Sequence, residues 1–213
     1  MKKMMYGLFF GDSITYGEYD GVFGGWVDIL KRYALQRYNE GSNEFILFNL
    51  GIGGETTEGL VKRIPHEISA RNSPEGNVIF IGYGANDLAK KDENYLVNPE
   101  QFKTNMVTAI QEAKKFSNDI YLVSILPFSK NVDGVIVASG KLRTNDKVLI
   151  YNQILKNIAV ENSLHYIDFH SAFLDDKEVL LSADGVHPNE KGYGMMAEIV
   201  IPIIEKYLQC NIS

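Results

Sequence analysis

The chain has 213 residues, of which 45% are hydrophobic and 23% are charged, and its net charge at pH 7 is -6. These values are ordinary for a globular protein with a substantial core, and the length fits a single domain over residues 1–213. Binding to nucleic acid requires clustered Lys and Arg to neutralise phosphates, and the acidic chain has no such cluster, so we expect no nucleic-acid partner.

The single cysteine, Cys210, excludes a disulfide within the chain and a cysteine metal cluster. The chain begins Met-Lys-Lys, but the apolar run that follows is short and has no small-residue cleavage site after it. No apolar run reaches the length of a membrane-spanning helix. We therefore expect a cytoplasmic protein with no membrane span and no metal site. The sequence does not indicate an oligomeric state.

Five apolar runs of strand length occur along the chain, at residues 4–10, 45–50, 78–82, 120–126 and 164–169. They are nearly continuous, which is typical of strands buried on both faces. Segments with helical spacing of apolar residues lie between and after these runs, and 56–71 is a further helix candidate. The spaced residues are Trp26, Leu30 and Tyr33; Phe102, Met106, Ile110 and Ala113; Val148, Tyr151, Leu155 and Ile158; and Met196, Ile199 and Ile203.

This alternation of strands and helices predicts an α/β fold with a parallel sheet covered on both faces. Right-handed crossovers leave few strand orders, and we predict the flavodoxin-like order. Ligands bind at the carboxyl ends of the strands in such sheets. Polar and Gly-rich clusters follow four of the five runs, at residues 11–13, 51–56, 84–87 and 184–188.

A serine hydroxyl becomes an effective nucleophile when a base takes its proton and a third group orients that base. Ser13 follows the first run, and Asp184 and His187 lie three positions apart after the last. Gly185 and Pro188 favour a turn there, and such a turn can fold the carboxylate back onto the imidazole. Asn189 can then cap the following helix.

Attack on an ester carbonyl places negative charge on its oxygen, which fixed hydrogen-bond donors can stabilise. The candidate donors are the backbone N–H groups of Ser13 and Gly54 and the side-chain amide of Asn86. We interpret Asp12 and Asp87 as hydrogen-bond acceptors that fix turns.

Four short blocks resemble those of a known family. Gly-Asp-Ser-Ile at 11–14 resembles the Gly-Asp-Ser-Leu block of the GDSL hydrolases, with Ile in place of Leu. Residues 49–56 resemble the second block, residues 84–87 match Gly-x-Asn-Asp, and residues 184–188 contain the Asp-x-x-His block. All four occur in the family's order and span most of the chain, so the sequence resembles the SGNH superfamily of serine hydrolases.

The resemblance implies a three-layer α/β/α sandwich with a flavodoxin-like, five-stranded parallel sheet. It also implies that Ser13 is the nucleophile, that His187 is the general base and then the acid, and that Asp184 orients His187. The oxyanion hole would consist of the N–H groups of Ser13 and Gly54 and the side chain of Asn86. Members of the family need no metal or organic cofactor.

We therefore predict a serine ester hydrolase that acts on a small-molecule ester with a short acyl chain. Lysophospholipase or thioesterase activity on longer chains is an alternative, and a catalytically idle binding domain on the same scaffold is another. Loops after the strands supply candidate substrate-binding aromatic residues, namely Tyr16, Tyr83 and Phe128. The irregular segment 127–145 matches no motif, and its role is open.

Overall fold

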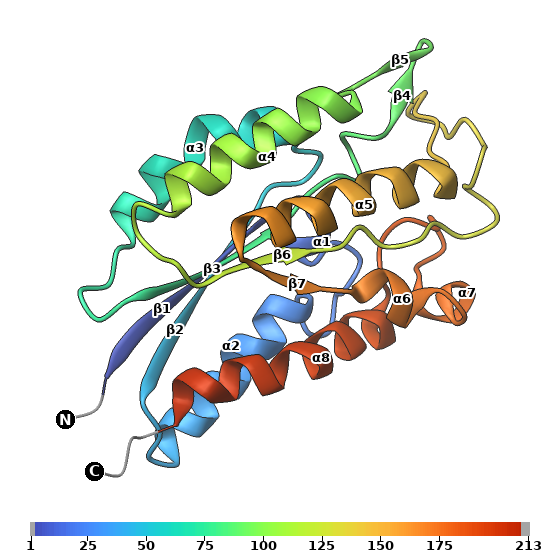
Figure 1. The fold of residues 1–213 in the computed structure, drawn as a ribbon. Helices are drawn as coiled ribbons and strands as arrows, with labels where there is room; N and C mark the ends of the chain where they lie inside the picture. The colour runs from blue at the N-terminus through green and yellow to red at the C-terminus, as the bar shows by residue number, and fades with distance from the viewer. Residues whose placement is uncertain (1–2, 210–213) are drawn as a thin grey trace.

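The computed structural model describes residues 3–209, so Cys210 lies outside the described residues. Its centre is a parallel sheet with the strand order β2-β1-β3-β6-β7 (Figure 1). Counted within this sheet, the order is 2-1-3-4-5, which confirms the predicted flavodoxin-like topology. The strands are β1 (Met4–Gly11), β2 (Glu44–Gly51), β3 (Asn77–Gly82), β6 (Ile120–Val123) and β7 (His165–Ile167).

Helices cover both faces of the sheet, as the sequence predicts (Figure 1). One face carries α3 (Thr57–Ala70), α4 (Pro99–Ala113) and α5 (Asn145–Asn162). The other carries α2 (Trp26–Asn39) and α8 (Glu190–Leu208). The shorter elements are α1 (Ser13–Tyr16), α6 (Phe169–Phe173), α7 (Lys177–Leu180) and the hairpin of β4 (Lys90–Lys91) and β5 (Asn94–Tyr95).

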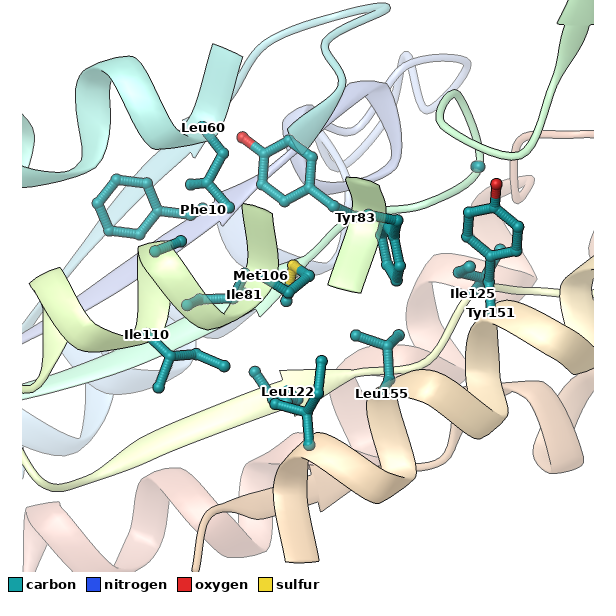
Figure 2. Close-up of a cluster of buried hydrophobic side chains, with 14 of the residues drawn as sticks. Phe10, Leu60, Ile81, Tyr83, Met106, Ile110, Leu122, Ile125, Tyr151 and Leu155 are labelled. Carbon is teal, nitrogen blue, oxygen red and sulfur yellow. The ribbon is translucent and has the colours of Figure 1, made fainter. Parts of the chain in front are cut away.

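Alternating side chains of the central strands fill two hydrophobic layers. In β1, Leu8 and Phe10 face the layer under α3, α4 and α5, whereas Phe9 faces the layer under α2 and α8. Figure 2 shows the first layer, in which Phe10 and Ile81 from the sheet meet Met106 of α4. Each fully buried side chain of this size contributes about 1.5–3 kcal/mol to folding, so both layers hold the sheet in place.

The strands β6 and β7 are shorter than predicted, because hydrogen bonds from a side chain and the start of a helix replace the hydrogen bonds between strands. The fourth run leaves the sheet after Val123, and the amide of Asn152 then bonds the N–H (2.8 Å) and the carbonyl (2.9 Å) of Ile125. The fifth run ends at Ile167, because Asp168 accepts a hydrogen bond from the N–H of Ser171 and starts α6. The short helices α1, α6 and α7 carry too few residues to show a helical period.

No helix within residues 3–209 is both long and apolar enough to cross a membrane.

Candidate active site

Ser13 lies in the tight connection between β1, an interior strand of the sheet, and the short helix α1. Asp12 caps this helix, because its Oδ1 accepts the N–H of Ile14 at 2.9 Å. Ser13 is therefore the first helical residue, and the first N–H groups of a helix have no carbonyl partner within it. Only 7% of Ser13 is exposed. The side chain thus stands at the carboxyl end of the middle of the sheet, where the fold places ligands.

His187 and Asp184 belong to a turn that closes on itself just before α8. The N–H of Ser182 donates to the carbonyl of His187 at 2.7 Å, and Asp184 Oδ1 accepts the N–H groups of Val186 and His187 at 3.0 and 3.1 Å. Gly185 has φ 69°, and a Cβ there would lie 2.2 Å from Ser129 Oγ. Only glycine suits this position, because it needs both a left-handed backbone and a close approach. Asn189 accepts the N–H groups of Lys191 and Gly192 and begins α8, which confirms the predicted cap.

These two elements bring Ser13, His187 and Asp184 into one chain of hydrogen bonds. His187 Nε2 lies 2.7 Å from Ser13 Oγ, and His187 Nδ1 lies 2.5 Å from Asp184 Oδ2. Burial alone would raise the pKa of Asp184, but hydrogen bonds from the His187 ring and from two backbone N–H groups lower it. An ionised Asp184 accepts the Nδ1–H of His187, which leaves Nε2 free to take a proton from Ser13.

The imidazole of His187 is also held from the side of the 17–24 loop. Tyr19 stacks on the ring at 4.9 Å between centroids and 22° between planes. Tyr19 has φ 70°, an uncommon backbone state for a residue other than glycine. Glu18 Oε2 lies 3.5 Å from His187 Nε2, and Tyr193 OH donates to the carbonyl of Glu18 at 2.8 Å. A second carboxylate thus faces the nitrogen that would carry the proton.

The remaining members of the predicted set, Gly54 and Asn86, lie across the same cleft. Gly54 has φ 75°, and a Cβ there would meet no atom within 4 Å, so its backbone is open to a ligand. Asn86 Nδ2 donates to the carbonyl of Glu55 at 3.2 Å. Its Oδ1 accepts from Lys141 Nζ at 3.2 Å and from Arg143 Nη2 at 3.3 Å. These contacts fix the plane of the amide.

A buried polar network supports the loop that carries Gly54. Arg63 Nη2 donates to the carbonyl of Leu50 at 2.7 Å, to Glu55 Oε2 at 2.7 Å and to Tyr83 OH at 2.8 Å. Tyr83 OH in turn donates to Glu55 Oε2 at 2.5 Å. The side chains of Arg63 and Glu55 are 15% and 12% exposed, so the ion pair is largely shielded from solvent. The network ties the end of β2 to the end of β3.

Around Ser13 the surface is hollowed into a cleft of about 160 Å³. Three of its lining residues, Ile14, Ala85 and Val186, provide apolar surface. The others are polar, charged or glycine, namely Ser13, Glu18, Gly54, Asn86, Lys141, Arg143 and His187.

The structure places the three candidate substrate-binding aromatic residues outside the lining of this cleft. Tyr83 is 2% exposed and lies among the buried side chains of the first layer (Figure 2), where its hydroxyl accepts a hydrogen bond from Arg63. Phe128 is 1% exposed and packs in the layer under α4 and α5. Tyr16, at 59% exposure, projects from α1 into solvent. Tyr83 and Phe128 thus serve the core, whereas Tyr16 faces solvent away from the cleft.

Residues that the sequence did not single out take part in the site instead. Lys141 and Arg143 reach Asn86 from the irregular segment 127–145, and Glu18 and Val186 line the cleft. Val186 sits inside the Asp-x-x-His block, so its position was available from the sequence. No sequence motif pointed to Lys141 and Arg143, because the segment around them matches no motif and has no hydrophobic periodicity.

Asp12 and Asp87 act as acceptors for backbone N–H groups, as the sequence indicated. Asp87 Oδ1 accepts the N–H of Thr57 at 2.9 Å, so it fastens the loop after β3 to the start of α3. Burial raises the pKa of both carboxyls to about 6. No group of three His, Cys, Asp or Glu residues suited to a metal ion occurs within residues 3–209.

The raised pKa of Asp12 predicts a pH-dependent gain in stability for Asp12→Asn. The folded chain holds this proton up to about pH 6, whereas the unfolded chain releases it near 3.8, so wild-type stability from this group falls as the pH rises through that window. Asn can still accept the N–H of Ile14 but does not titrate. The free energy of unfolding of Asp12→Asn, relative to wild type, should therefore rise by on the order of 1–3 kcal/mol between pH 4 and pH 7.

Urea unfolding at a series of pH values measures this difference, and Asp168→Asn provides a control of opposite sign. Burial acts to raise the pKa of Asp168, but hydrogen bonds from Ser171 and Lys156 lower it overall. Its removal should cost more at pH 7 than at pH 4. A pH-independent difference between Asp12→Asn and wild type would contradict the assignment of a buried, protonated Asp12.

Comparison with known proteins identifies the family of this chain. The profile of the GDSL-like lipase/acylhydrolase family matches residues 9–195. The human isoamyl acetate-hydrolyzing esterase 1 homolog is 27% identical over 93% of this chain and 81% of its own length. The isoamyl acetate-hydrolyzing esterase of Saccharomyces cerevisiae is 25% identical over 94% of this chain and 86% of its own.

A solved structure shares the whole fold. The crystal structure of a lipase/acylhydrolase from Enterococcus faecalis aligns with a TM-score of 0.76 and 26% identity, over 99% of this chain and 100% of the other. The family profile covers most of the chain, including all four blocks that contain Ser13, Gly54, Asn86 and His187. The chain therefore belongs to the GDSL-like lipase/acylhydrolase family and is a carboxylic ester hydrolase.

Proposed function

We propose that this esterase cleaves short-acyl esters of small alcohols or sugars through an acyl-enzyme intermediate on Ser13. The observation that carries the proposal is the chain of hydrogen bonds from Ser13 Oγ to His187 (2.7 Å) and from His187 to Asp184 (2.5 Å). A serine, an imidazole and an ionised carboxylate in this order are the groups that nucleophilic acyl transfer needs.

In the first step, Ser13 Oγ attacks the ester carbonyl while His187 Nε2 takes the hydroxyl proton. The tetrahedral oxyanion accepts hydrogen bonds from the N–H groups of Ser13 and Gly54 and from Asn86 Nδ2. The C–O bond to the alcohol then breaks, and His187 gives its proton to the departing oxygen. Asp184 stays ionised throughout and stabilises the imidazolium that forms.

In the second step, water attacks the acyl-enzyme while His187 takes one of its protons. The oxyanion forms again in the same position, the bond to Ser13 Oγ breaks, and the proton returns to that oxygen. The products are one carboxylic acid and one alcohol for each water consumed. The scheme needs no metal ion and no organic cofactor.

The size of the cleft supports a short acyl group. Its volume is about 160 Å³, and a cavity of roughly 150 Å³ holds a benzene-sized molecule. The carbonyl and a few methylenes fill such a space. Two relatives are named for hydrolysis of isoamyl acetate, an ester of the two-carbon acid, which is consistent with this estimate.

A series of p-nitrophenyl esters from acetate to palmitate tests the acyl preference. We expect kcat/KM to be highest for acetyl to butyryl esters and to fall at least about tenfold by decanoyl, because longer chains do not fit the cleft. A maximum at long chains would instead favour lysophospholipase or thioesterase activity.

Labelling with a fluorophosphonate, followed by peptide mass analysis, tests the nucleophile separately. We expect one adduct, on the peptide that contains Ser13. An unlabelled protein without esterase activity would point to the idle binding domain.

A further inference from the structure

Two cations reach the proposed oxyanion hole from the segment 127–144. This segment lies between β6 and α5. A bridge between Lys90 and Leu142 joins it to β4, and a bridge between Asp133 and Arg143 joins its two halves. Arg143 is 8% exposed, and its Nε donates to the carbonyl of Ala85 at 2.9 Å. The segment therefore has a defined position at the cleft, although it contains no long helix or strand.

Both cations contact the same atom. Lys141 Nζ and Arg143 Nη2 donate to Asn86 Oδ1 at 3.2 and 3.3 Å. Within residues 3–209, neither Lys141 nor Arg143 forms an ion pair with a carboxylate within 4.0 Å. For Arg143, the charges of Asp12 and Asp184 offset the cost of burial only without direct contact, so the acceptors that touch its guanidinium are the carbonyl of Ala85 and Asn86 Oδ1.

We propose that Lys141 and Arg143 are positioning residues of the oxyanion hole, which hold the Asn86 amide by its oxygen and stabilise the negative charge of the tetrahedral intermediate. The inference rests on the proposed acyl-enzyme function of this cleft. It assigns a role to the segment that matches no motif in the sequence.

The chemistry of the donors fixes the orientation of Asn86. Lys and Arg side chains only donate hydrogen bonds, so the atom facing them must be the amide oxygen. A flipped amide would set its NH2 group against two cations. With Oδ1 held, Nδ2 gives one hydrogen to the carbonyl of Glu55, and its second hydrogen is available for the oxyanion.

The charges of the cleft also match those of the transition state. That state carries a positive imidazolium at His187 and a negative oxyanion beside Asn86. Asp184 and Glu18 flank the imidazole, whereas Lys141 and Arg143 flank the amide. Burial lowers the pKa of Lys141. The positive charges of Arg143 and Lys91 lower this pKa further, whereas the negative charge of Asp12 raises it. This partial desolvation strengthens the field that the ammonium exerts.

Lys141→Met, which removes the charge but keeps an unbranched chain, tests the proposal against p-nitrophenyl acetate. We expect kcat to fall about 10- to 100-fold with KM changed less than about threefold, because the contact acts on the transition state. Affinity for butylboronic acid, which forms a tetrahedral anion on a serine, should weaken by the same factor as kcat/KM. Lys141→Arg should restore most of the loss.

Lys91→Met is the matched control. Lys91 is an exposed residue of β4 whose charge also acts on Lys141, but the hydrogen bonds of the Asn86 side chain go to Glu55, Lys141 and Arg143 and not to Lys91. Lys91→Met should keep kcat within about twofold of wild type, since a solvent-exposed charge that does not touch the amide contributes little. Thermal unfolding of each variant checks the fold, and Lys141→Gln replaces Lys141→Met if the latter does not fold.

Three outcomes would overturn the proposal. These are wild-type kcat in Lys141→Met, an equal loss in Lys91→Met, and a loss confined to a carboxylate-bearing ester such as the p-nitrophenyl hemisuccinate. The last would make the cations a recognition site for an anionic substrate. Ser13→Ala, assayed together with the Lys141 variants, distinguishes failure of this inference from failure of the proposed function. An inactive Ser13→Ala with a fully active Lys141→Met refutes only this inference, whereas an active Ser13→Ala refutes the proposed function.

Discussion

Replacing Ser13 by alanine should lower kcat for p-nitrophenyl acetate by on the order of 10⁴- to 10⁶-fold, the loss typical when a serine hydrolase loses its nucleophile. Ser13 Oγ is the atom that His187 Nε2 contacts at 2.7 Å, and without it the imidazole has no hydroxyl to deprotonate. The residual activity would come from direct attack of water on the bound ester, with the oxyanion donors stabilising the negative charge that forms.

The fold should tolerate this change. Alanine keeps the Cβ of Ser13, and the cap of α1 is made by Asp12 and not by the serine hydroxyl. Initial rates at high enzyme concentration measure the loss, and circular dichroism checks the fold. Ser139→Ala, at an exposed position of segment 127–144, is the matched control and should be fully active. A wild-type rate in Ser13→Ala would exclude the acyl-enzyme mechanism.

Asp184→Asn should lower kcat by about 10⁴-fold, less than the loss of His187 itself. Asn can keep its oxygen on the N–H groups of Val186 and His187, which Asp184 Oδ1 accepts at 3.0 and 3.1 Å. Its NH2 group then faces His187 Nδ1, in place of the Asp184 Oδ2 that lies at 2.5 Å. This contact favours the tautomer that carries its proton on Nε2, which cannot accept the proton of Ser13.

The ranking of variants is the informative measurement. His187→Ala, Asp184→Asn and the control Asp175→Asn, at an exposed position, should be compared under the same conditions. We expect His187→Ala to lose the most, Asp184→Asn to retain measurable turnover, and Asp175→Asn to equal wild type. Equal losses in His187→Ala and Asp184→Asn would indicate that Asp184 does more than orient the imidazole.

Much of the fold was predictable because apolar runs buried on both faces carry their own signal. The ends of β6 and β7 were not. Asn152, which replaces the ladder at Ile125, lies 27 positions away in the sequence. The helix that begins after Asp168 depends on a side-chain cap inside an apolar stretch. In both cases a polar side chain determines where the strand ends, and the pattern of hydrophobic residues does not indicate that position.

The candidate site divides along a similar line. The blocks that contain Ser13, Gly54, Asn86 and His187 are recognisable because each follows a strand or opens a helix. Tyr83 looked equally suited to a pocket wall, but its hydroxyl pairs with Arg63, a partner 20 positions away that no spacing rule connects to it. Lys141 and Arg143 reach Asn86 over 55 and 57 positions through an irregular segment. Tertiary contacts of this range are set by packing and not by local pattern.

The hydrogen bond between Ser13 and His187 joins residues 174 positions apart, one just after β1 and the other in the turn before the last helix. The chain is synthesised from its N-terminus, so the proposed nucleophile is made early and its proposed base late. The residues of β1, β2 and β3 are all synthesised well before His187, so a chain at that stage lacks the proposed base for Ser13. In the proposed mechanism, ester hydrolysis therefore requires the turn that carries His187 to dock at Ser13, and we expect a chain that ends before this turn to be inactive toward esters.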